Sequence, residues 1–120
     1  MAISQAMVTS FKKALLDGEM DFSSNTSQTF KIALFTSSAT LNATTTAFST
    51  TNEVSGTGYT SGGNTLALTG TNSSVPTTSG TTAFLSFANT TWGTATITAR
   101  GALIYKSGGG DPAVAVLDFG

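Results

Sequence analysis

The chain has 120 residues, of which 39% are hydrophobic and only 9% are charged, and its formal net charge is −1. This length is that of one domain with a single core, whereas ordinary soluble domains carry about 25% charged residues. The sequence has no His and no Cys, which excludes disulfides, thiol catalysis, Ser–His nucleophiles and zinc bound by His or Cys. We therefore expect a protein that is not an enzyme and that has no catalytic residues, metal or cofactor.

The charges also limit the partners that we expect. The five cations are scattered apart from one adjacent pair, and they are Lys12, Lys13, Lys31, Arg100 and Lys106. Because such a chain offers no basic face to release counterions from a phosphate backbone, we expect no nucleic-acid partner. No apolar run approaches the length that spans a bilayer, so we expect no membrane contact. A surface rich in Thr, Ser, Asn and Gly can meet another protein without desolvating ions.

The first predicted element is a helix over residues 4–16, with Ser4 as its N-cap. Met7, Phe11 and Leu15 recur at helical spacing and form one apolar stripe, and Gly18 ends the helix. Two interpretations stay open: the helix covers one side of a sheet, or it is an arm that docks on a neighbouring subunit. We accordingly divide the chain into a helix or arm (1–22) and a β domain (23–120) that together fold as one unit.

Strand patterns fill the rest of the chain. The clearest covers 29–36, where Phe30, Ile32 and Leu34 alternate onto one face. The other predicted strands cover residues 65–69, 81–88, 95–105 and 113–119, and the last is apolar on both faces apart from Asp118. Residues 37–51 are predicted as a loop and residues 53–64 as glycine-rich turns. Short strands at regular spacing predict a mainly β fold, namely an antiparallel β-sandwich or partly open barrel of about six strands with one N-terminal helix.

Two isolated charges in the β region form the only side-chain pair that we predict there. Glu53 and Arg100 each lie in an uncharged neighbourhood, and a charge near a core needs a partner. We expect a salt bridge between them, or backbone hydrogen bonds, to hold the glycine-rich turns to the strand at 95–105.

Three segments of the chain are distinctive when taken together, and they are Asn-Glu-Val-Ser-Gly-Thr-Gly-Tyr-Thr-Ser-Gly-Gly (52–63), Ile-Thr-Ala-Arg-Gly-Ala-Leu-Ile-Tyr (97–105) and Ala-Val-Leu-Asp-Phe-Gly (115–120). In this order they resemble a group of small proteins encoded among the virion genes of tailed bacteriophages. The resemblance extends from about Phe11 onward and implies a structural role in the virion, with no catalytic residue to carry over. Similar chains continue past Asp118-Phe119-Gly120 with another strand. We therefore expect either that this strand is absent here or that a partner supplies it by β-augmentation.

A capsid decoration or cement protein, present in many copies on a symmetric lattice, is the first functional hypothesis. Such a protein binds the assembled shell and stabilises it by mass action. Its partners would be other virion proteins, the major capsid protein above all, and further copies of itself. The predicted contacts are the helix stripe (Met7, Phe11, Leu15) and the last strand (Val114, Val116).

A tail-associated structural protein or host-surface glycan-binding module is the alternative hypothesis. It requires solvent-facing aromatic side chains, for which Tyr59, Trp92 and Tyr105 are the candidates. Trp92 also fits packing in the core, because an indole ring buries a large apolar area.

Overall fold

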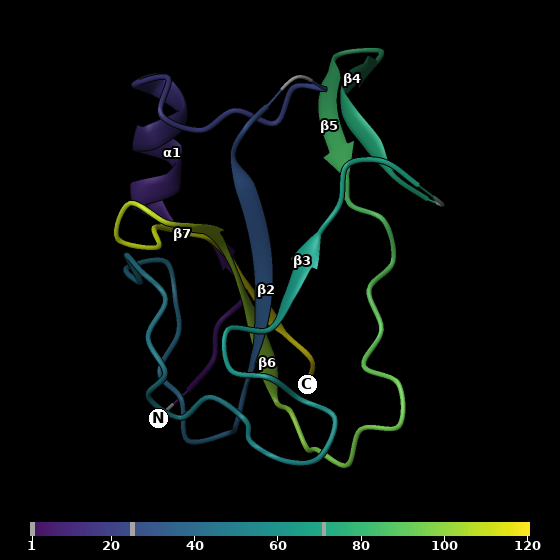
Figure 1. The fold of residues 1–120 in the computed structure, drawn as a ribbon. Coiled ribbons are helices and arrows are strands. Elements are labelled where there is room, and N and C mark those ends of the chain that lie inside the picture. The colour runs from purple at the N-terminus through teal and green to yellow at the C-terminus, as the bar shows by residue number, and fades with distance from the viewer. Residues whose placement is uncertain (1, 25, 71) are drawn as a thin grey trace.

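The computed structural model describes residues 2–24, 26–70 and 72–120 of the chain (Figure 1). Within these residues it has seven strands and one helix. In chain order they are β1 (Ala6–Met7), α1 (Thr9–Leu16), β2 (Thr29–Phe35), β3 (Asn64–Leu66), β4 (Ser74–Ser79), β5 (Thr82–Ser86), β6 (Gly101–Ser107) and β7 (Ala113–Asp118). The predicted mainly β class with one N-terminal helix is confirmed.

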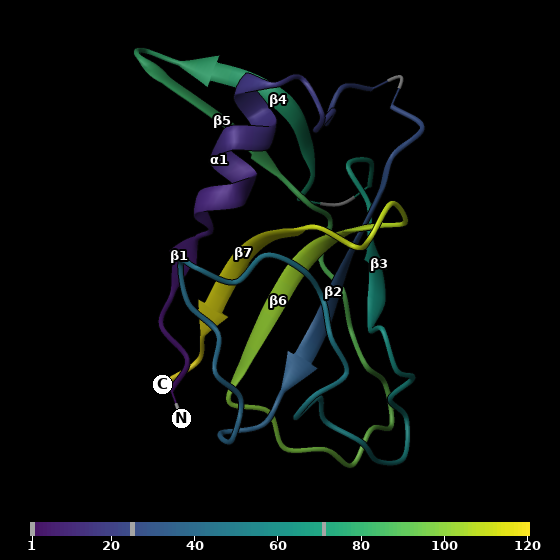
Figure 2. The ribbon, with the colours of Figure 1, turned by 90° about the vertical axis from the view of Figure 1, so that its left-hand side faces the viewer.

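Five strands form one antiparallel sheet in the order β1-β7-β6-β2-β3, and Figure 2 shows them next to one another in this order. β2 lies between β6 and β3, and it pairs with β6 over its full length, from Thr29↔Ser107 to Phe35↔Gly101. β3 pairs only with the first part of β2, and residues 52–54 lie along the rest of it, where the Val54 amide donates to the Leu34 carbonyl oxygen. The sheet does not close into a barrel within the described residues.

β4 and β5 form a separate two-stranded hairpin, which projects beyond one end of the sheet (Figure 1). The sequence pattern predicted β5, as the strand over 81–88, but it did not predict β4. The β4 sequence is polar apart from Val75 and Pro76 and carries no alternation of apolar residues. Proline is tolerated here because β4 has a strand on one side only.

The N-terminal segment differs from the predicted helix over 4–16. Residues 6–7 are a strand whose partners are Ala115 and Val116 of β7, and the helix begins only at Thr9. Val8 occupies the N-cap without a side-chain hydrogen bond, so the predicted Ser4 cap is wrong. The edge of β7 offers backbone hydrogen-bond partners to residues 6–7, and a helix over these residues could not use them. The pairing is a tertiary contact, so the helical spacing of apolar residues does not reveal it.

Both faces of β2 are buried, because different segments cover them. On one face, Phe30 stacks on Phe22 with ring centroids 4.2 Å apart. On the other face, Phe48 stacks on Tyr105 at 4.5 Å and packs edge-on against Phe35. The predicted loop over 37–51, which supplies Phe48, thus forms part of the core cover.

Candidate interaction surface

An apolar groove of about 550 Å³ lies between the N-terminal segment, β7 and the β4–β5 hairpin. Figure 1 shows α1 and the hairpin on opposite sides of the same end of the sheet. All the residues that line the groove are apolar. They come from β1, α1, the segment before β2, β4 to β7 and the residue that follows β5, and they are Met7, Phe11, Leu15, Phe22, Pro76, Ala83, Phe84, Leu85, Phe87, Ile104, Val114 and Ala115.

Four of the five predicted contact residues line this groove, namely Met7, Phe11, Leu15 and Val114. Met7 is 51% exposed and Leu15 is 44% exposed, whereas Phe11 and Val114 are buried and form its floor. Val116 is 0% exposed, so its prediction as a contact residue is corrected. In β7 it pairs with Ala6 and Leu103, which enclose it from both neighbouring strands.

The helix covers its own sheet, which was one of the two interpretations of the stripe. Phe11 and Ala14 are its buried residues, and Phe11 packs edge-on against Phe22 at 5.9 Å. The Val8 amide donates to the Val114 carbonyl oxygen and thereby fixes the start of α1 to β7. The N-terminal segment is therefore joined to the β region by backbone pairing and by the shared core. Its use as an arm on a neighbouring subunit stays a prediction.

The hairpin adds the most exposed aromatic ring of the groove. Phe84 of β5 is 43% exposed, although a Phe side chain gains about 1.5–3 kcal/mol from full burial. Monomeric proteins seldom expose contiguous apolar patches of this kind, and such patches mark contact sites for other molecules. The sequence did not predict that the hairpin lines the same groove as α1, because β4 and β5 approach α1 only in the tertiary structure.

Glu53 ties the glycine-rich turns to β2. Its carboxylate accepts hydrogen bonds from the Tyr59 hydroxyl (2.7 Å), the Ser61 hydroxyl (2.8 Å) and the Gly62 amide (2.7 Å). The Tyr59 oxygen in turn accepts a hydrogen bond from the Leu34 amide at 2.9 Å. The Glu53 carboxylate and the Tyr59 hydroxyl therefore belong to one hydrogen-bond network that joins residue 53, the turn at 59–62 and β2.

The predicted ion pair between Glu53 and Arg100 is corrected by this network. Arg100 instead forms a salt bridge with Asp118, at the end of β7. The other alternative, backbone hydrogen bonds between the glycine-rich turns and residues 95–105, is present, because the Thr96 amide donates to the Thr57 carbonyl oxygen at 2.9 Å. Arg100 lies beside the start of β6, where β7 is the neighbouring strand, so the carboxylate of Asp118 is closer to it than that of Glu53.

The pKa of the Tyr59 hydroxyl lies well above its ordinary value, because of burial and because of the hydrogen bond to Glu53. The folded state therefore holds this proton more tightly than the unfolded state, whose tyrosine titrates near pH 10. Stability from this group is complete below about pH 10 and is lost as the pH rises above it. We expect the urea midpoint to fall as the pH rises above about 10, and to fall less in Tyr59→Phe. An equal fall in both proteins would contradict this assignment.

The three aromatic residues predicted for glycan binding do not form one exposed platform. Tyr105 is 3% exposed, and its hydroxyl donates to the Gly62 carbonyl oxygen at 2.6 Å, which corrects the expectation that it faces solvent. Tyr59 and Trp92 are half-buried and stack with centroids 6.2 Å apart. The Trp92 Nε1 atom is buried and has no hydrogen-bond partner among the residues that the structure describes, and the ring packs against the core.

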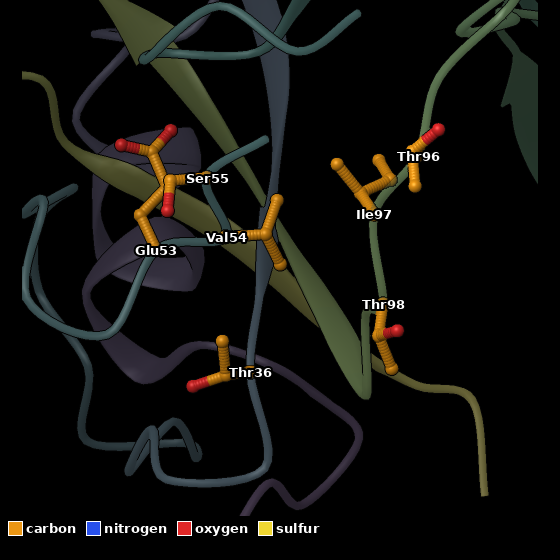
Figure 3. A pocket seen from close by; sticks show the side chains of 7 residues that line it. All are labelled: Thr36, Glu53, Val54, Ser55, Thr96, Ile97 and Thr98. Atoms are coloured by element: carbon orange, nitrogen blue, oxygen red, sulfur yellow. The ribbon is translucent and has the colours of Figure 1, made fainter. Parts of the chain in front are cut away.

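A second hollow, of about 390 Å³, is a slot between two stretches of backbone. One wall is Glu53 to Ser55 and the other is Thr96 to Thr98, with Thr36 between them. Figure 3 shows Val54 and Ile97 facing each other across the slot, while the Glu53 carboxylate points away from the opposite wall. The slot therefore presents hydroxyl groups and aliphatic side chains but no free charge.

No cluster of three or more metal-binding side chains occurs in the described residues. Among these residues, no helix has the length and apolar character needed to cross a membrane. No protein-family model, no curated protein and no solved structure matches the chain.

Proposed function

We propose that this protein is a non-enzymatic structural component of a tailed-bacteriophage virion, where it decorates the capsid and stabilises the assembled shell. The resemblance of residues 52–63, 97–105 and 115–120 to small virion proteins supports the class of protein that we propose, a structural component of the virion. The observation that carries the proposal is the apolar groove, in which Met7, Leu15 and Phe84 stay exposed in the isolated chain. The occupant that we propose is an apolar segment of the major capsid protein.

Charge and hydrogen bonding also favour protein contact over chemistry. The groove contains no charged residue, so a partner can cover it without desolvating an ion. The carboxylate of Glu53, a residue that lines the slot, accepts hydrogen bonds from three donors. A protein of this kind stabilises a shell because it binds the assembled lattice and not the dissociated subunits.

The test is rebinding of purified protein to virions assembled from a genome that lacks this gene. We expect Leu15→Glu to weaken binding about 10- to 100-fold, which corresponds to the loss of one buried Leu side chain. Leu16→Glu is the matched control, because Leu16 is the adjacent helical residue, is 90% exposed and does not line the groove. Its binding is expected to match that of the unmodified protein.

The copy number per virion, measured by quantitative gel analysis, separates the head from an appendage. Hundreds of copies, together with shells that rupture more easily when the gene is deleted, are the expected results. A dozen or fewer copies would place the protein in the tail and contradict the decoration role. Equal binding of the Leu15 and Leu16 variants, with both folded by circular dichroism, would exclude the groove as the contact.

A further inference from the structure

Residues 95–99 have the sequence of a β-strand, but no strand within the described part of the chain pairs with them. The predicted strand over 95–105 is correct only from Gly101 onward. The preceding residues, Ala95-Thr96-Ile97-Thr98-Ala99, follow the positive-φ residue Thr94 (φ 52°) and all have negative φ. Figure 3 shows Thr96, Ile97 and Thr98 along one nearly straight run, and Figure 1 shows the connection from β5 to β6 as the outermost segment on its side of the molecule.

The backbone of this run is bonded to its own chain on one side only. The Thr96 amide donates to the Thr57 carbonyl oxygen at 2.9 Å, and the Arg100 amide donates to the Phe35 carbonyl oxygen at 2.8 Å. In an extended strand, successive residues direct their N–H and C=O groups to opposite sides. The groups of Ala95, Ile97 and Ala99 therefore lie on the other side, and none of them has a backbone or side-chain partner among residues 2–24, 26–70 and 72–120.

The sequence of the run reads the same in both directions around Ile97. In an antiparallel pair of two such runs related by a two-fold axis at Ile97, Ile97 lies opposite Ile97 and Ala95 lies opposite Ala99. These are the residues with free backbone groups, so they form the hydrogen-bonded pairs. Thr96 then lies opposite Thr98 in the non-hydrogen-bonded pairs, and cross-strand Thr–Thr pairs are favourable.

We propose that two copies of this chain pair through residues 95–99 as antiparallel strands. A second copy is the indicated occupant, because an isologous interface requires a patch that is complementary to itself, and this sequence has that property. Open strand edges are usually protected by charged side chains or proline, and residues 95–99 contain neither. The exposed Thr96 and Thr98 side chains add no charge repulsion.

Disulfide trapping tests the pairing and its register, since the chain has no cysteine of its own. Residues opposite each other in a non-hydrogen-bonded pair have Cα atoms about 4.5 Å apart, within the range for a disulfide. Thr96 of one copy and Thr96 of the other would be diagonal neighbours about 7–8 Å apart, too far for one. We expect Thr96→Cys mixed with size-tagged Thr98→Cys to form a cross-linked heterodimer under mild oxidation, and each variant alone to cross-link at least tenfold more slowly.

Cross-linking at equal rates in the mixture and in each variant alone would overturn the proposed register, and no cross-linking at all would overturn the pairing. Sedimentation of the untagged protein gives an independent measurement, with a monomer–dimer equilibrium as the expected result. Thr96→Lys/Thr98→Lys places like charges opposite each other twice and should raise the dimer dissociation constant about tenfold. Thr96→Lys/Thr98→Glu places opposite charges there and should leave it within about threefold.

Both double variants change only exposed side chains, so their folding is expected to match that of the unmodified protein. A monomer at every concentration, or equal weakening by both variants, would contradict the proposal. Because these measurements use purified protein without virions, their outcome is separate from that of the capsid-binding experiment.

Discussion

Gly63→Ala is expected to prevent stable folding. A Cβ atom at this position would lie 1.8 Å from the carbonyl oxygen of Ile32 and 2.6 Å from its carbonyl carbon. Both are backbone atoms in the middle of β2, so they cannot rotate away as a flexible side chain could. Gly63 also has φ +78°, which disfavours any residue with a Cβ. The substitution must therefore separate β3 from β2.

The expected cost of Gly63→Ala exceeds about 4 kcal/mol, which is comparable with the total stability of a typical domain, about 5–15 kcal/mol. The measurement is urea denaturation, or soluble yield where the variant does not fold. Gly80→Ala is the matched control, because Gly80 has φ +58° but no atom within 4 Å of the added Cβ. It should cost only the left-handed backbone penalty of about 1–2 kcal/mol. Equal losses in the two variants would show that backbone strain, and not the contact with Ile32, determines the effect.

Glu53→Ala is expected to lower the free energy of unfolding by about 3 kcal/mol, because hydrogen bonds to charged groups contribute about 1.5–3 kcal/mol each when they are well sheltered. The substitution removes the acceptor of the Tyr59 hydroxyl, which is half-buried, and of the Gly62 amide, whose residue is buried. It also removes the only direct link between the turn at 59–62 and residue 53. Thermal denaturation should show a decrease in Tm of roughly 10 °C.

Ser61→Ala is the control for Glu53→Ala, because it removes a single hydrogen bond at an exposed position. Its expected cost is below about 1 kcal/mol. Glu53→Gln keeps one acceptor oxygen without the charge, and it should lie between the two. If Glu53→Ala were no worse than Ser61→Ala, the network around Tyr59 would contribute little to stability.

The two largest predicted effects arise at the same corner of the fold. Gly63 brings the chain against Ile32 at the start of β3, and Glu53 holds the preceding turn beside the end of β2. The same corner positions the Thr57 carbonyl oxygen, which accepts a hydrogen bond from the Thr96 amide. Loss of either residue should therefore disturb the wall of the slot from which residues 95–99 are presented.

Where a segment carries its own pattern, the sequence predicted it closely. Alternating Phe30, Ile32 and Leu34 gave a strand over 29–36 that the structure places at Thr29–Phe35, and the apolar run at 113–119 is β7 at Ala113–Asp118. The groove residues on the helix side, Met7, Phe11 and Leu15, were also found by their spacing. These are local signals, because side-chain burial repeats with the backbone geometry of the segment itself.

Such local patterns did not predict which residues and strands pair with one another in the fold. Met7 was assigned to the helix, yet it pairs with Ala115 because β7 has an open edge there. Arg100 was paired with Glu53, yet it binds Asp118, which is adjacent only after β6 and β7 have paired. The strand-forming residues 95–99 were expected in the sheet, yet no described strand pairs with them.

The sequence by itself determined that this protein is mainly β, has few charged side chains, and carries an apolar stripe at Met7, Phe11 and Leu15. Only the tertiary structure decided that this stripe lies in one groove between α1, β7 and the β4–β5 hairpin, and that Glu53 closes a turn. Periodicity along a chain specifies which side of a segment is buried, whereas the segments that meet are selected by long-range packing and by hydrogen bonding between strand edges.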